Sequence, residues 1–125
     1  MRNIFLFTIV ISLTAFSCEK EESMPHNTCG INNPLKELSW LKLYIQRQEQ
    51  NYPDIAKYLY IAQAEYNGQT VFLYYNCNPL NDTIVPVYNC QGELLFYLGQ
   101  EPKNGAEIKN EKIIWKPANF ACAGN

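Results

Sequence analysis

Few side chains in this 125-residue sequence could act as a nucleophile or a general base. The only histidine is His26, and the only serines after residue 17 are Ser23 and Ser39. A Ser–His or Cys–His catalyst needs a base held within hydrogen-bond reach of its nucleophile. His26 and Ser23 belong to a polar stretch with no predicted element, and Ser39 falls inside a predicted helix. We therefore expect no catalytic triad.

Carboxylates are the remaining candidates for acid–base chemistry. A pair of them could cleave a glycosidic bond if the two groups flanked it. The acidic residues in question adjoin predicted turns or lie in predicted loops, which favours solvation over catalysis: Asp54, Glu65, Asp82 and Glu93. The sequence also has no glycine-rich phosphate loop. We interpret the chain as a non-enzyme without a cofactor, and a small carboxylate enzyme stays as an alternative.

The cysteines number five, an odd count that asks for an explanation in a secreted protein. If Cys18 has another use, four remain at separations of 48, 13 and 32 positions: Cys29, Cys77, Cys90 and Cys122. A zinc site usually brings cysteines in close C-x₂₋₄-C pairs, and a thiol oxidoreductase uses C-x-x-C. Neither spacing occurs, so we expect no metal site. Four cysteines in an oxidising compartment predict two disulfides.

Tyrosine is unusually frequent, with nine copies, all after residue 17. Its flat apolar ring and polar tip suit packing across neighbouring strands, and they also suit the binding of glycans or protein partners. Both interpretations stay open. If there is a binding face, its first candidates are Tyr58, Tyr60 and Tyr66, with Tyr74 on the adjacent strand.

A helix is predicted from about Asn33 to Gln50. Asn33 suits the N-cap and Pro34 the first helical position. The apolar residues that follow fall on one helical stripe: Leu35, Leu38, Leu41 and Ile45. Trp40 lies outside this stripe, so it either packs against a curved sheet or faces a binding partner.

Strands are predicted over residues 58–66, 69–77, 84–90 and 93–98, with a possible fifth over 112–115. Asn67-Gly68 is a strong signal for a tight hairpin turn between the first two. Pro86 belongs at a sheet edge or among the first residues of its strand. The predicted fold class is α+β: one N-terminal amphipathic helix packed on an antiparallel β-meander of four to five strands. Residues 29–125 would form this single domain.

Meander geometry bears on how the cysteines pair. Cys77 and Cys90 would lie at opposite ends of the sheet, whereas a disulfide needs Cα atoms within about 7 Å. A helix that runs back along the sheet brings Cys29 to the end where Cys90 lies. We therefore favour the pairs Cys29–Cys90 and Cys77–Cys122.

The first 17 residues resemble a bacterial lipoprotein signal peptide. Arg2 precedes an apolar run over residues 4–16, and 13 helical residues span only about 20 Å of a bilayer core of about 30 Å. Residues 13–18 then resemble a lipobox, which implies that Cys18 carries acyl chains that anchor the protein to a membrane. Residues 18–28 would be an acidic tether. The alternative is an ordinary cleaved signal peptide.

The acidic residues after Cys18 indicate where in the cell envelope the protein lies. Glu19, Glu21 and Glu22 resemble the export signal of surface-exposed Bacteroidetes lipoproteins, which implies a surface-exposed outer-membrane protein. A periplasm-facing position is the alternative. Asp82-Thr83-Ile84 resembles the short O-glycosylation acceptor of the same bacteria, with Thr83 as the attachment site.

Three further segments resemble a group of small Bacteroidetes lipoproteins of unknown function. They are the CG-x-x-NPL-x-x-L-x-WL pattern over residues 29–41, YNGQTVF over 66–72 and VYNCQG over 87–92. The resemblance covers about residues 29–99, and it implies no catalytic residues.

Net charge excludes one class of partner. The formal charge of the whole chain is −2, and no basic patch stands out to neutralise nucleic-acid phosphates. The hypothesis from sequence is a lipid-anchored envelope binding domain without catalytic activity, whose partner is a protein or a glycan. The alternative is an inhibitor of a protease or other enzyme that acts through a disulfide-pinned loop, either residues 76–82 or 99–106.

Overall fold

The structure is a computed structural model that describes residues 29–81, 84–100 and 107–122. Four predictions lie outside the described residues: the signal peptide over 1–17, acylation of Cys18, the tether over 18–28 and the glycan on Thr83. Within the described part of the chain, no helix is long and apolar enough to cross a membrane.

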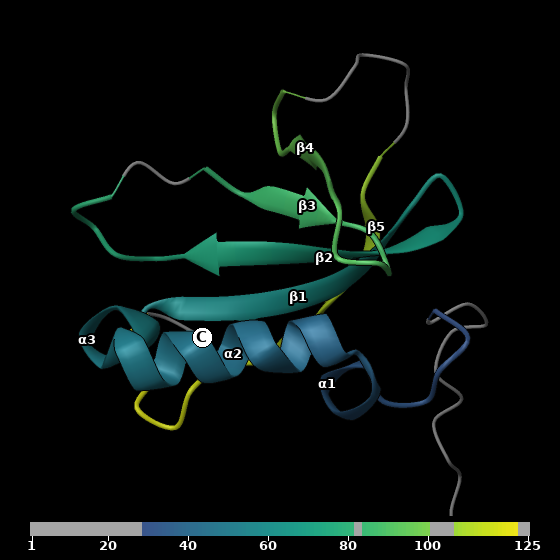
Figure 1. Ribbon diagram of the computed structural model, residues 1–125. Coiled ribbons are helices and arrows are strands. Elements are labelled where there is room, and N and C mark those ends of the chain that lie inside the picture. The colour runs from purple at the N-terminus through teal and green to yellow at the C-terminus, as the bar shows by residue number, and fades with distance from the viewer. Residues whose placement is uncertain (1–28, 82–83, 101–106, 123–125) are drawn as a thin grey trace, which may run out of the picture.

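Short helices precede a five-stranded antiparallel sheet, which confirms the predicted α+β class (Figure 1). The helices are α1 (Pro34–Glu37), α2 (Ser39–Asn51) and α3 (Pro53–Ala56). The strands are β1 (Leu59–Tyr66), β2 (Gln69–Asn76), β3 (Pro86–Tyr88), β4 (Leu94–Tyr97) and β5 (Lys109–Trp115). Their order in the sheet is β4-β3-β2-β1-β5. The first four strands form the expected meander, and β5 returns to pair with β1 at the opposite edge.

The predicted helix is interrupted once. Asn33 caps α1 through its side chain, which accepts a hydrogen bond from the Lys36 N–H, and Pro34 holds the first position as expected. Leu38 then has an extended backbone, with φ −84° and ψ 101°, and α2 begins at the next residue. The prediction of one continuous helix is therefore wrong at this point. Leu35 and Leu38 still pack against the buried cluster that contains Leu41, so the break does not remove them from the core.

The central strands β1 and β2 are buried on both faces, whereas the edge strands β4 and β5 are mostly exposed. α2 runs along one face, where Leu41 packs on Ile61, Phe72 and Tyr74 (Figure 1). The opposite face carries small aliphatic residues: Ala62, Ala64, Val71, Leu73, Val85 and Val87. Side chains alternate between the faces along each strand, so the register decides which residues meet.

The β1–β2 hairpin has the predicted tight turn. Asn67 and Gly68 both have positive φ, at 50° and 72°, and Tyr66 pairs with Gln69. β2 and β3 share only two register pairs, Phe72 with Tyr88 and Leu73 with Val87. Pro86, which has no N–H to donate, is the first residue of β3 as predicted. Beyond these pairs the two strands diverge (Figure 1).

Two disulfides close the fold, which confirms their prediction from the cysteine count. They join Cys29 to Cys90 and Cys77 to Cys122, with Cα separations of 5.6 and 5.7 Å. These are the pairs that the meander geometry favours. The second one holds the C-terminal segment beside β1, where the Ala121 N–H also donates to the Lys57 carbonyl at 2.8 Å.

Candidate functional site

A pocket of about 210 Å³ lies where β2 and β3 diverge. Five tyrosines from four elements line it: Tyr44 of α2, Tyr60 of β1, Tyr74 and Tyr75 of β2, and Tyr88 of β3. Its other lining residues are Leu59, Ile61, Asn76, Ile84 and Pro86. We call it the tyrosine pocket. Pockets for drug-sized ligands measure about 300–1,000 Å³, so this one has room for about one ring or one side chain.

Three of the five rings form a continuous cluster on the helix side of the sheet. The Tyr74 ring centroid lies 4.3 Å from that of Tyr44 and 4.6 Å from that of Tyr88. Tyr74 is only 8% exposed. It lies on this side because its register partner on β1 is Ile61, a core residue beneath the helix. Tyr44 reaches it from α2, one turn after Leu41.

The hydroxyls of this cluster are neutral and lack a described protein partner. Burial, and then the neighbouring Tyr88, raise the pKa of Tyr44 to about 12. Burial, and then Tyr44 and Tyr88, raise the pKa of Tyr74 well above its usual value. Among the described residues, none accepts from or donates to the hydroxyls of Tyr44, Tyr74 and Tyr88. Tyr74 is buried and Tyr44 and Tyr88 are half-buried, and buried polar groups are normally paired, so the Tyr74 hydroxyl above all is a candidate for ligand recognition.

On the other side of the pocket, Tyr60 and Tyr75 form a stacked pair of rings. The Tyr60 and Tyr75 rings are 4.7 Å apart and nearly parallel, at 8°. Burial, and then a hydrogen bond with the Glu111 carboxylate of β5, raise the pKa of Tyr75. Burial and the Glu111 charge likewise raise the pKa of Tyr60. Burial, and then Tyr97, also raise the pKa of Tyr88. All five pocket tyrosines therefore have a raised pKa and are protonated at neutral pH.

The predicted tyrosine face is not a single surface. Tyr60 pairs with Tyr75 and Ile61 pairs with Tyr74, so Tyr74 faces the helix while Tyr60 faces the other way. The prediction that Tyr74 joins the face of the other three tyrosines is wrong because strand register assigns it to the opposite side. Tyr60 and Tyr74 meet only at the pocket.

The two other predicted tyrosines lie elsewhere. Tyr66 is at the far end of β1, where its ring packs 4.7 Å from that of Phe96. Tyr58 precedes β1, and the Lys57 ammonium lies 5.1 Å from its ring centroid. Sequence reasoning missed Tyr44, Tyr75 and Tyr88. A signal for Tyr75 was available, because a two-residue turn at positions 67 and 68 sets it directly opposite Tyr60.

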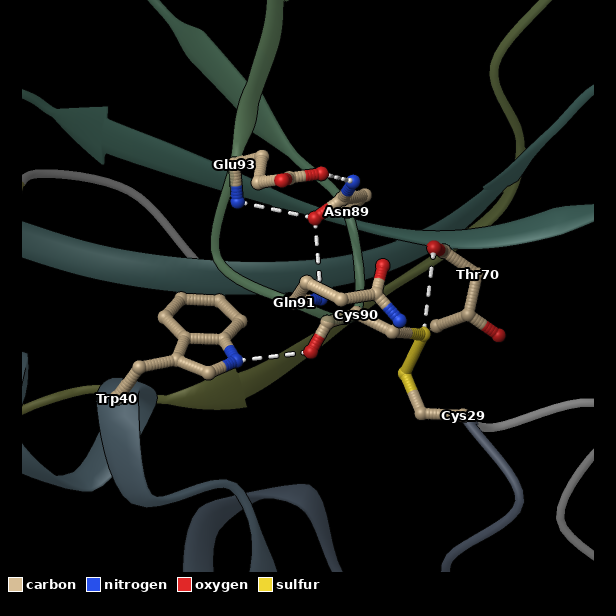
Figure 2. Close-up of a disulfide and its surroundings, with 7 residues drawn as sticks. All are labelled: Cys29, Trp40, Thr70, Asn89, Cys90, Gln91 and Glu93. Atoms are coloured by element: carbon tan, nitrogen blue, oxygen red, sulfur yellow. Dashed lines mark hydrogen bonds between the residues drawn. A yellow bond between two sulfur atoms is a disulfide. The ribbon is translucent and has the colours of Figure 1, made fainter.

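Trp40 lies at the start of α2, one turn before Tyr44, and packs against the sheet, the first of its two interpretations. Its Nε1 donates to the Cys90 carbonyl at 2.8 Å (Figure 2). Its ring meets Phe72 edge-on, with centroids 5.6 Å apart at 77°. Gly92 lies directly against the indole, since a Cβ there would be 2.7 Å from Trp40 Cδ2. Trp40 is therefore a structural residue here.

A larger hollow of about 300 Å³ surrounds the Cys29–Cys90 disulfide. Figure 2 shows that the Asn89 side chain, which lines this hollow, is hydrogen-bonded to residues of its own turn. The Asn89 Oδ1 accepts from the N–H groups of Gln91 and Glu93 at 3.0 and 2.9 Å. Its Nδ2 donates to the Glu93 carboxylate at 2.8 Å. These bonds explain Asn89 structurally, so we favour the tyrosine pocket as the candidate site.

Side-chain hydrogen bonds support the turn that directly follows β2. Asn76 Oδ1 accepts from the Asn78 N–H at 2.9 Å, and Asn78 Oδ1 accepts from the Leu80 N–H at 3.0 Å. Cys77 ties its base to Cys122, and Leu80 at its tip is 90% exposed. Of the other predicted loop, residues 101–106 lie outside the described chain.

The carboxylates that the sequence offered for acid–base chemistry have local structural roles where the structure describes them. Glu65 accepts from Asn110 at 3.0 Å, Glu93 belongs to the turn above, and Asp54 lies in the first turn of α3. Asp82 lies outside the described residues. In the part of the chain that the structure describes, no three His, Cys, Asp or Glu side chains are placed to hold a metal ion.

Comparison of the chain with protein-family models, curated proteins and solved structures found no match. The resemblance to small Bacteroidetes lipoproteins stays a prediction.

Proposed function

We propose that this chain is a non-enzymatic binding domain of the bacterial cell envelope, anchored by acyl chains on Cys18, whose partner is a protein or a glycan. One observation carries the proposal: the tyrosine pocket, in which a nearly buried tyrosine and its neighbours present hydroxyls with no described protein partner. Groups arranged in this way suit recognition of another molecule.

The chemistry of the pocket supports binding over catalysis. Its described lining residues carry phenols, one carboxamide and apolar side chains, and none of them carries a carboxylate. A general base works best with a pKa near the operating pH. The phenol pKa values are shifted the other way, because burial raises those of Tyr44 and Tyr74. The pocket is thus poorly suited to proton abstraction.

An extracytoplasmic position is supported by the two disulfides, which persist in oxidising compartments. The proposed site is the outer membrane with the domain on the cell surface, and a periplasm-facing orientation is the alternative. Labelling with radioactive palmitate tests the anchor. Incorporation is expected in the native chain and should vanish in Cys18→Ala, and equal labelling of both would contradict it. A glycan on Thr83 would appear as a mass increment that Thr83→Ala removes.

The binding function is tested by capture from native envelope, with the full chain tagged at its C-terminus and mildly cross-linked. Three single variants separate the surfaces: Tyr88→Phe in the pocket, Leu80→Asp on the loop, and Tyr52→Phe as a control on a 54% exposed side chain. We expect a partner that is weakened by Tyr88→Phe and unaffected by the other two changes. Failure to capture any protein or glycan would contradict the proposal.

A second candidate function is inhibition of an envelope or secreted enzyme. The observation that favours it is the Leu80 loop, because a single exposed apolar side chain on a disulfide-pinned, side-chain-supported turn can enter a partner's pocket without a large ordering cost. In the same capture, a partner lost with Leu80→Asp and retained with Tyr88→Phe would indicate this function. Residual activity of that partner, measured with and without the chain, would then decide it.

A further inference from the structure

We propose that the tyrosine pocket binds the ring of a neutral sugar. This inference rests on the proposed binding function and names the class of its partner. Three properties of the pocket lead to it: its volume, its lack of charge and its unpartnered hydroxyls.

Volume limits the occupant to about one ring. The pocket measures about 210 Å³, below the range typical of drug-sized ligands. It is a half-open pocket formed by residues of four elements, with Tyr44 on the helix side and Ile84 and Pro86 on the side of β3. A terminal sugar, or one ring of a longer glycan that continues into solvent, meets this limit.

The described part of the pocket wall carries no charge. None of the ten described lining residues is acidic or basic. The nearest carboxylate known to act on it is that of Glu111, which is already engaged by Tyr75. A charged group placed in this site would be desolvated without a counter-ion, and that is unfavourable. The ligand is therefore neutral.

The hydroxyls distinguish a sugar from an apolar side chain. Tyr74 is 92% buried, and its hydroxyl, like those of Tyr44 and Tyr88, has no partner among the described residues. Each phenol can donate one hydrogen bond and accept others. A leucine or phenylalanine side chain from a protein would cover these groups and leave them unpaired, which is costly. A sugar ring offers several donors and acceptors over the span of one ring.

The tyrosine rings suit the rest of such a molecule. Sugar rings have apolar C–H surfaces between their hydroxyls, and tyrosine combines an apolar ring with a polar tip. Asn76 adds a carboxamide at the same pocket, and its Oδ1 already accepts from the Asn78 N–H. The Asn76 Nδ2 group can therefore donate to a ligand while Oδ1 holds the loop.

The test is direct binding of the purified full chain to neutral methyl glycosides of glucose, galactose and N-acetylglucosamine. Glucuronate and glucosamine serve as charged counterparts. Saturation-transfer NMR detects binding, and titration calorimetry gives the Kd. We expect at least one neutral probe to bind, and the charged counterparts to bind at least about 10-fold more weakly.

Matched variants locate the site. Tyr74→Phe keeps the ring and removes the buried hydroxyl, so the Kd should rise about 5- to 10-fold. Tyr88→Phe should act in the same direction, and Tyr66→Phe, outside the pocket, should leave the Kd unchanged. The melting temperature of Tyr74→Phe should equal or exceed that of the native chain, because the hydroxyl has no described protein partner. A purely structural hydroxyl would lower it.

Three results would overturn the inference. The first is equal affinity of the native chain and both pocket variants, which would place the sugar elsewhere. The second is preference for a charged counterpart. The third is no binding of any neutral probe up to high millimolar concentration. In that third case, a captured protein that is lost with Tyr88→Phe would leave the binding function standing and exclude only the sugar. If no partner were captured either, both proposals would fail.

Discussion

Trp40 and Tyr44 project from α2 one turn apart, toward the same face of the sheet. They differ in whether their polar atom has a hydrogen-bond partner among the described residues. The Trp40 N–H donates to the Cys90 carbonyl next to a disulfide, and its ring fills the space that Gly92 leaves. The Tyr44 hydroxyl enters a cluster with Tyr74 and Tyr88 in which no described residue bonds it.

This difference separates the two ends of the helix–sheet interface by role. At the tryptophan end the indole N–H is bonded within the chain and the ring packs on Phe72 and Tyr88, so changes there should act on stability. At the tyrosine end polar groups are left for another molecule, so changes there should act on binding and only weakly on stability. Four predictions examine this contrast.

The largest effect is expected for Trp40→Ala. It removes the indole between α2 and Phe72 together with the bond to Cys90, and it should cost about 3–5 kcal/mol of unfolding free energy. Chemical denaturation followed by circular dichroism measures the change. A loss below about 1 kcal/mol would mean that the tryptophan end does not carry the fold.

Gly92→Ala should cost about 2–3 kcal/mol, because φ is +80° and the new Cβ would meet the indole. Gly68→Ala is the matched control: its φ is +72° and nothing lies within 4 Å of its Cβ position. It should lose only the backbone component, about 1 kcal/mol. Equal losses in the two variants would show that the contact with Trp40 contributes little.

Alkaline pH should weaken the tyrosine end. The folded pKa of Tyr44, about 12, exceeds its usual value of 10.0, so between these pH values the folded state holds a proton that the unfolded state releases. The stabilisation is complete below pH 10 and is lost as pH rises toward about 12. We expect a loss on the order of 1–2 kcal/mol over this window, after allowing for partial solvent exposure. Denaturation at several pH values should show a smaller slope for Tyr44→Phe, and an unchanged slope would contradict the assignment.

The smallest effect is expected for Tyr44→Phe at neutral pH. The ring contact with Tyr74 is kept, and the lost hydroxyl has no described partner, so the unfolding free energy should change by less than about 0.5 kcal/mol. Thermal and chemical denaturation measure this. A loss above about 1 kcal/mol would reveal a structural hydrogen bond and would erase the contrast with Trp40.

Much of the fold follows from local patterns. Asn33-Pro34 marks the helix start because the asparagine side chain caps the helix and proline suits its first position. Asn67-Gly68 marks the hairpin turn because both positions need a positive φ. The pairing of Cys29 with Cys90 followed from the order of strands and the limited reach of a disulfide. The break at Leu38 carried no such mark, since leucine is a good helix former and no glycine or proline stands beside it.

The candidate site was harder to predict. The helical stripe was correct, yet Tyr44 lies beside that stripe and becomes part of the site only because β2 places Tyr74 beneath it. The return of β5 to β1, which brings Glu111 to Tyr75, is a long-range pairing with no local signal.

By itself, then, the sequence determined the element types, the hairpin and the number of tyrosines, because these depend on residue chemistry and short spacings. The disulfide pairs followed from it only through the expected order of the strands. Only the tertiary structure decided which tyrosines meet. Strand register assigns Tyr60 and Tyr74 to opposite faces, and the divergence of β3 from β2 at Pro86 brings residues of both faces to one pocket. A one-residue shift in pairing would exchange the faces. The Asn67-Gly68 turn fixes this register, but only the packing of α2 on the sheet decides that the Tyr74 side is the one beneath the helix.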